Sequence, residues 1–162
     1  FIQQASAATG ETVNVSVLDG DDVLYIARSN SPRLVSIGFH AGARAPAHVV
    51  SPGPVLLAAM KEPALAKWIE HHDFAGYTPE SVTDRRTFLR QVRLAQAQGW
   101  WATAGQLDTG LTGVSLPLKD RRGRCIAAVG MTVQTVHWNM QRVVAQLLPV
   151  LQTAAQDLRQ IL

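Results

Sequence analysis

The feature that most constrains the fold of this chain is a β-hairpin pattern close to its start. From Val13 to Leu18, apolar and polar residues alternate, which is the period of a strand with one buried face. The acidic and glycine residues at 19–22 are turn formers, and a second apolar run follows from Val23 to Arg28. Two such runs around a short turn predict a pair of antiparallel strands.

Further strand and helix patterns follow in blocks. A third strand is predicted from Leu34 to Phe39, and two later strands, Gly113–Leu118 and Cys125–Gln134, flank a charged turn at 119–124. Helices are predicted between these blocks. The first begins at Pro54, whose missing N–H costs nothing in a first helical turn. Strands, then helices, then strands again are typical of a layered α+β domain.

Several helix boundaries are marked by capping and helix-breaking residues. Residues Phe1–Thr9 are predicted to be the last part of a helix, which Gly10 terminates. Thr83 is the predicted N-cap of a later helix. The last segment, His137–Leu162, repeats apolar residues in a heptad-like seam that we expect Pro149 to bend. The simplest interpretation of this seam is a helix packed on its own sheet.

Composition places the chain among globular proteins. Its 162 residues fit one domain, and 47% apolar with 17% charged residues is unlike a disordered chain. The single cysteine, Cys125, excludes an internal disulfide and a multi-cysteine zinc site. The longest near-apolar stretch, Val55–Met60, is far shorter than the roughly 20 residues of a membrane span. The sequence begins at Phe1 without a signal-like segment, so we expect an excised part of a longer cytoplasmic protein.

The net charge of +3 does not by itself predict nucleic-acid binding. The basic residues stand in short groups, and the sequence has no zinc-finger spacing, no RNP-like aromatic motif and no compact helix-turn-helix segment. We interpret these residues as a solvated surface, whose positive charge favours anionic ligands.

The sequence contains no motif that predicts catalysis. Ser51 lacks the G-x-S-x-G context, and Walker, G-x-G-x-x-G and H-E-x-x-H motifs are absent. His48 lies near Ser51 without a carboxylate motif, and the adjacent rings of His71 and His72 cannot chelate one metal ion. Cys125 stands in an apolar run, as a small core residue does. We therefore predict no catalytic residue, no metal and no cofactor.

Two features instead indicate a binding cavity. The helix that opens at Ser51, Pro52 and Gly53 presents backbone N–H groups and the positive end of its dipole, which suits a carboxylate. Small residues also gather on the predicted later strands. This space can be filled by a packed helix or by a ligand, and the sequence leaves both open. The small residues are Ala128, Gly130 and Thr132 on one strand, after Ile126, and Gly113 and Ser115 on the other.

Four groups of motifs together resemble one known family, the effector domains of IclR-type transcriptional regulators. The motifs occur in the same order over nearly the whole chain, and the sequence is most similar to the branch of the family that senses aromatic acids. The motifs are Gly10–Val15 with Asp19–Arg28; Gly42–His48 with Gly53 and Leu56–Ala58; Gly99 with Gly110, Leu111 and Leu116–Gly123; and Leu148–Leu151.

The resemblance implies a GAF-like fold, a curved and mainly antiparallel sheet of about six strands with helices on both sides. It implies that residues 1–9 end a linker helix from an N-terminal winged helix-turn-helix domain, and that 10–162 form the effector-binding domain. Operator DNA would be bound only through that further domain. Homodimers that can pair into tetramers are implied as well, and no membrane partner.

The family's pocket positions can be carried over residue by residue. The turn that holds a ligand carboxylate falls on Ser51–Gly53, and apolar walls fall on Leu34 and Ile37. Relatives that sense small keto acids have bulkier or acidic residues at several further positions. The smaller or neutral residues of this chain enlarge the pocket and imply a small aromatic carboxylate, of the 4-hydroxybenzoate or protocatechuate type. These positions are Thr103 (an acid in those relatives), Gly113 (a cysteine), Gly130 (a serine) and Thr132 (another polar hydroxyl).

The carboxylate turn departs from the family pattern because Pro52 and Pro54 have no N–H to donate. The Ser51 hydroxyl and the N–H groups of Gly53 and Val55 must then donate more of the hydrogen bonds to the carboxylate, or another side chain must donate as well. The candidates for this assistance are His48, Arg28 and Arg33.

Three other functions stay open at this point. An aromatic dicarboxylate such as terephthalate is an alternative effector. A small GAF-like hydrolase or reductase would use Ser51 or Cys125, and turnover lost in Ser51→Ala would support it. A purely structural oligomerisation domain would bind no ligand.

Overall fold

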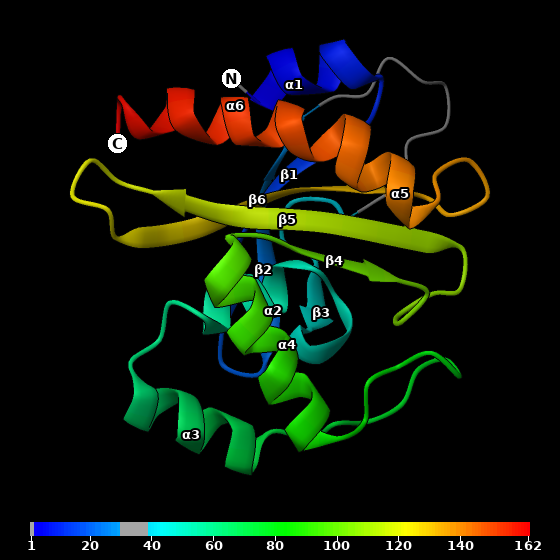
Figure 1. The fold of residues 1–162 in the computed structure, drawn as a ribbon, viewed down its shortest axis with the longest axis vertical. Helices are drawn as coiled ribbons and strands as arrows, with labels where there is room; N and C mark the ends of the chain where they lie inside the picture. The colour runs from blue at the N-terminus through cyan, green and yellow to red at the C-terminus, as the bar shows by residue number, and fades with distance from the viewer. Residues whose placement is uncertain (1, 30–38) are drawn as a thin grey trace.

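A computed structural model describes residues 2–29 and 39–162, and within them the chain forms one six-stranded sheet covered by helices on both faces (Figure 1). The strand order is β3-β2-β1-β6-β5-β4, and every neighbouring pair is antiparallel. This is the predicted α+β architecture. The strands are β1 Val13–Asp19, β2 Asp22–Arg28, β3 Arg44–Pro46, β4 Trp101–Ala104, β5 Leu111–Lys119 and β6 Cys125–Gln134.

The helices divide between the two faces (Figure 1). One face carries α1 Ile2–Thr9, α5 Met140–Arg142 and α6 Leu148–Arg159. The other carries α2 Pro52–Leu57, with α3 Glu62–His71 and α4 Arg85–Gln98 packed outside it. A 3₁₀ turn, η1 Ala47–Val49, leads into α2, and a π-helical turn, η2 Val143–Leu147, joins α5 to α6.

The hairpin, the helix end at Thr9 and the two long later strands are confirmed. The short strands β3 and β4 were not predicted, and the strand predicted at 34–39 lies outside the described residues except for Phe39. The N-cap of α4 is Asp84 and not Thr83. Asp84 takes this position because its carboxylate accepts both the N–H of Thr87 and the hydroxyl of Thr87.

The C-terminal segment is helical, with a π-helical turn just before Pro149. Proline has no N–H for the helical ladder, and here it stands in the first turn of α6, directly after the wider π turn. Both halves of the seam reach the sheet, where Val143, Leu147 and Leu151 are fully buried. They join β5 and β6 residues such as Val114 and Val129 in one core cluster.

On the opposite face, the space beside two small residues of the sheet, Gly130 and Ala128, is already filled. Gly130 shows this most clearly: a Cβ there would lie 2.3 Å from the Ser115 Oγ and 2.6 Å from the Val114 carbonyl oxygen. The expectation of open space beside Gly130 is therefore wrong, because the neighbouring strand and its side chain fill it. Ala128 is likewise packed against Val55 and Leu56 of α2.

Among the described helices, none combines the length and the apolar character that a membrane crossing requires.

Candidate functional site

A hollow lies on the α2 face, toward the β4 edge of the sheet. The strand register builds its floor, since Thr103 on β4 stands opposite Gly113 on β5, and Gly113 stands opposite Thr132 on β6. Ser51, at the start of α2, lies directly over Gly113: a Cβ on that glycine would be 2.9 Å from the Ser51 Oγ. Four predicted site residues that are far apart in the sequence thus meet at one place.

The hollow has a volume of about 330 Å³ measured out to its mouth. That volume includes space open to solvent; the enclosed part is about 30 Å³, well below the roughly 300–1,000 Å³ of ligand pockets, so a small molecule would enter only if the lining side chains move apart. Its walls come from β2, from the end of η1 with the two residues that follow it, and from the loop between β4 and β5. The lining residues beyond the four already named are Tyr25, Phe39, Val49, Val50, Gln106, Leu107, Asp108, Leu111 and Thr112.

One wall of the hollow is aromatic. The rings of Tyr25 and Phe39 stack with centroids 4.3 Å apart and planes within 9° of parallel. Burial raises the pKa of the Tyr25 phenol well above its usual range, so the group stays neutral. A flat apolar wall of this kind is suited to contact with a planar ligand.

The polar groups of the hollow are mostly neutral. Thr103 and Thr132 supply hydroxyls, Gln106 supplies an amide, and the exposed carboxylate of Asp108 stands at the rim, where it accepts the N–H of Gly110. Among the described lining residues, no lysine, arginine or histidine is found. An anionic ligand would therefore be held by neutral donors.

The start of α2 offers fewer donors than the sequence predicted. The N–H of Gly53, expected to serve a ligand, donates to the Val50 carbonyl at 3.2 Å. The hydroxyls of Ser51 and Ser115 share a hydrogen bond of 2.7 Å. This pair holds two protons and uses one between its oxygens, so when Ser115 donates, the Ser51 O–H is left to donate into the hollow.

The other predicted site residues do not line the hollow. Ser115, Pro52 and Gly53 are buried behind its wall. His48 is buried too, and its ring nitrogens contact the Ala75 carbonyl and His72 rather than the hollow. The predicted walls at Leu34 and Ile37 lie outside the described residues.

The geometry offers no catalytic dyad at the two candidate nucleophiles. Ser51 is bonded to a hydroxyl rather than to a base. Burial raises the pKa of the Cys125 thiol, which disfavours the reactive thiolate. Within the described residues, no cluster of three or more His, Cys, Asp or Glu side chains could hold a metal ion.

Comparison with known proteins decides the family. Residues 1–160 match the model of the family described as "Bacterial transcriptional regulator IclR C-terminal". The chain belongs to the IclR family. The resemblance seen in its motifs is thereby confirmed, and since this family is not one of enzymes, the hydrolase and reductase alternative is set aside.

Two curated IclR relatives are each 31% identical to this chain. The Pca regulon regulatory protein of Pseudomonas putida aligns over 98% of the chain, and the p-hydroxybenzoate hydroxylase transcriptional activator of Acinetobacter baylyi over 99%. The chain spans only 55% and 61% of the lengths of these two relatives.

A solved IclR structure supports the same placement. The inducer-binding domain of the PobR transcription factor from Acinetobacter, a double mutant in complex with 3-hydroxybenzoic acid, superposes with a TM-score of 0.93. Its sequence is 31% identical, and the match covers 99% of this chain and 94% of that one. The chain is therefore an IclR effector-binding domain with the GAF-like fold.

Proposed function

We propose that the hollow binds a small aromatic carboxylic acid of the 4-hydroxybenzoate or protocatechuate type. The observation that carries this proposal is the stacked Tyr25–Phe39 wall beside a floor of neutral hydroxyls. The names of the two relatives, a p-hydroxybenzoate hydroxylase transcriptional activator and a Pca regulon regulatory protein, point the same way. So does the 3-hydroxybenzoic acid bound by PobR.

The charges at the hollow separate the two candidate effectors. The ligand carboxylate would accept a hydrogen bond from the Ser51 hydroxyl, and the far end of the ring would meet the hydroxyls of Thr103 and Thr132. Asp108 at the rim repels a second carboxylate but can accept a hydrogen bond from a phenol. A hydroxybenzoate therefore fits this lining better than terephthalate does.

For the whole protein, we propose that this ligand controls the transcription of aromatic catabolism genes. Residues 1–9 would end a linker from a winged helix-turn-helix domain, 10–162 would sense the effector, and the protein would act as a homodimer or a pair of dimers. The chain's coverage of only 55% and 61% of its relatives supports a further domain.

A ligand panel tests the proposed effector. At 100 times its dissociation constant, 4-hydroxybenzoate should raise the free energy of unfolding by about 2.7 kcal/mol, measured as a thermal shift. Calorimetry should rank it above benzoate and terephthalate, and pyruvate should not bind. Equal binding of 4-hydroxybenzamide would show that the hollow has no carboxylate site. If no aromatic acid shifts the melting curve, the chain is better explained as an oligomerisation domain.

The domain proposal predicts that residues 1–162 alone do not bind operator DNA selectively. The IclR match covers the effector-binding part, and the net charge of +3 gives only weak, salt-dependent attraction to any duplex. A gel-shift titration with operator and scrambled duplexes checks this. Nanomolar binding that distinguishes the two would contradict it.

A further inference from the structure

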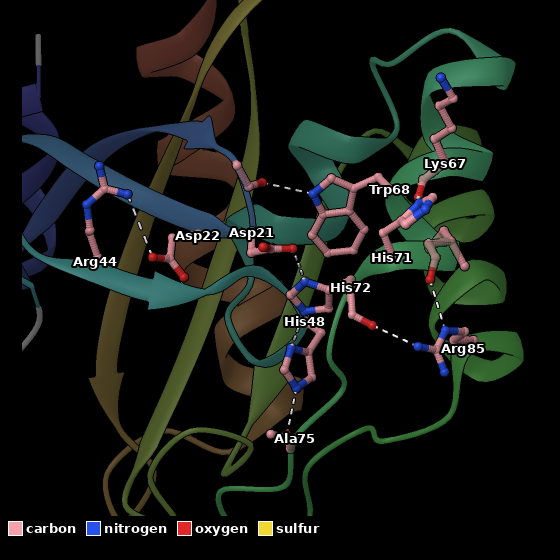
Figure 2. A network of polar contacts seen from close by, with 12 residues as sticks. Asp21, Asp22, Arg44, His48, Lys67, Trp68, His71, His72, Ala75 and Arg85 are labelled. Atoms are coloured by element: carbon pink, nitrogen blue, oxygen red, sulfur yellow. Dashed lines mark hydrogen bonds and ion pairs between the residues drawn. The ribbon is translucent and has the colours of Figure 1, made fainter.

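Two buried histidines and one carboxylate form a continuous chain of contacts on the α2 face, outside the hollow (Figure 2). The His48 Nε2 lies 2.7 Å from the Ala75 carbonyl oxygen, and the His48 Nδ1 lies 2.8 Å from the His72 Nε2. The His72 Nδ1 in turn lies 2.8 Å from the Asp21 Oδ1. His48 lies in η1, and His72 directly follows α3. Ala75 lies in the loop beyond α3, and Asp21 lies in the β1–β2 turn.

Counting protons along this chain shows that two neutral rings cannot make all three contacts. A carbonyl oxygen only accepts, so the His48 Nε2 must carry a proton, and the Asp21 carboxylate likewise requires one on the His72 Nδ1. A neutral imidazole holds a single N–H, which leaves both facing nitrogens bare. Two lone pairs at 2.8 Å repel, whereas one added proton turns this contact into a hydrogen bond.

The added proton is disfavoured on His48. Burial lowers the pKa of His48, as does the His72 ring, and these effects outweigh the Ala75 carbonyl and Asp73, which raise it. His72 instead faces the Asp21 carboxylate on one side and the face of Trp68 on another, with ring centroids 4.1 Å apart and planes within 17° of parallel. An aromatic face stabilises a cation stacked on it.

The surrounding charges leave Asp21 available as the counter-ion. Arg44 pairs with Asp19 and, as Figure 2 shows, with Asp22. Arg85 donates to the backbone carbonyls of Ile69 and His72, and the His71 Nδ1 contacts the Lys67 carbonyl. The Tyr77 ring lies 6.0 Å from that of His48. Of the described residues, α2 itself adds no charge, since it consists of Pro52–Leu57.

We propose that the His48–His72 pair carries one proton more than two neutral imidazoles at neutral pH, and that this proton positions the wall of the hollow. His48 directly precedes Val49, Val50 and Ser51, which line the hollow. The same turn is held by the Ala47 N–H, which donates to the Asp21 carbonyl. The hydrogen bonds that this proton completes therefore connect the β1–β2 turn, the end of α3 and the η1 segment that leads to Ser51.

The sign of the resulting pH dependence follows from the proton count in each state. In the unfolded chain both histidines titrate at a pKa of about 6.5. Above that pH the folded pair holds one proton that the unfolded chain lacks, so stability falls as the pH rises. Below it the unfolded chain binds two protons and the folded pair one, so stability falls as the pH drops. The pair's contribution is therefore largest near pH 6.5.

The direct test is ¹⁵N NMR of the histidine rings in the 162-residue protein at pH 7.5. We expect one of the two buried rings to be an imidazolium with both nitrogens protonated, and the other to be neutral. In Asp21→Asn the imidazolium should be lost at this pH. In the matched control Asp22→Asn it should persist, because Asp22 faces Arg44 instead. Two neutral rings in the wild type at pH 7.5 would overturn the proposal.

A second readout connects the proton to the hollow. The backbone amide shifts of Val49–Ser51 should titrate together with the imidazolium in the wild type and in Asp22→Asn, but not in Asp21→Asn. If the proposed function holds, the affinity for 4-hydroxybenzoate should fall several-fold between pH 7 and 9 in the wild type and in Asp22→Asn. An absence of benzoate binding at any pH would reject the proposed function alone. An imidazolium whose titration leaves these amides unmoved would reject the positioning role.

Discussion

Replacing Gly53 with alanine should lower the free energy of unfolding by about 3 kcal/mol or more, the upper part of the range for overpacked sites. A Cβ at this position would lie 1.7 Å from the Ala47 carbonyl oxygen and 2.7 Å from its carbonyl carbon. Both are backbone atoms of η1, so no side-chain rotation can relieve the clash. Helix α2 cannot retreat either, because its other side is packed on the sheet.

Gly76→Ala is the matched control for this prediction. A Cβ at Gly76 would meet only the Thr83 Cγ2, at 3.5 Å, which is an ordinary contact. Because alanine also restricts the unfolded chain, this variant should be neutral or more stable by up to about 1 kcal/mol. Chemical denaturation followed by circular dichroism measures both. Equal midpoints for the two variants would mean that η1 and α2 are not seated as closely as described.

The regular parts of this fold could be predicted because local patterns determine them. The alternation from Val13 to Leu18 has the strand period, and Pro149 cannot continue a helical ladder whatever its surroundings. β4 escaped prediction since only four residues, Trp101–Ala104, form it, and pairing with β5 rather than its own pattern defines it. The cap at Asp84 was missed because Thr83 and Asp84 are both good N-caps, and only the backbone geometry selects between them.

The candidate site could be predicted only to the extent that a resemblance supplied positions. Ser51, Thr103, Gly113 and Thr132 meet because strand register and the start of α2 bring them together, which no local pattern reveals. Other lining residues had a weaker signal. The segment 105–110 is rich in turn formers between two strands, as loops at a sheet end are, and it contributes Gln106, Leu107 and Asp108.

Small residues on a sheet face carry an ambiguity that only the structure resolves. Gly113 and Gly130 are both on the α2 face, and the sequence treats them alike. In the fold, Gly113 borders the hollow under Ser51, whereas the space beside Gly130 is filled by Ser115 and β5 backbone. Similarly, His48 is close to Ser51 in sequence, yet its ring is directed to His72.

Thr103→Asp should weaken the binding of 4-hydroxybenzoate by about thirty-fold. Thr103 lines the hollow beside Gly113, so the new carboxylate would face the anionic ligand across neighbouring strands. At about 8 Å and an effective dielectric constant of 20, two unit charges repel by about 2 kcal/mol, which corresponds to this factor. The neutral 4-hydroxybenzamide should lose much less affinity, because it carries no charge to repel.

Ala104→Asp controls for the added charge. Ala104 is the next residue on β4 and is exposed, so its side chain lies on the opposite side of the strand from Thr103. It adds the same charge to the same strand without lining the hollow, and its effect on affinity should be small and removed by salt. Calorimetry with the acid and the amide on wild type and both variants measures these differences. If Thr103→Asp and Ala104→Asp bind the acid equally well, the ligand does not occupy the space above Thr103, Gly113 and Thr132, and the aromatic-acid site must be sought elsewhere in the domain.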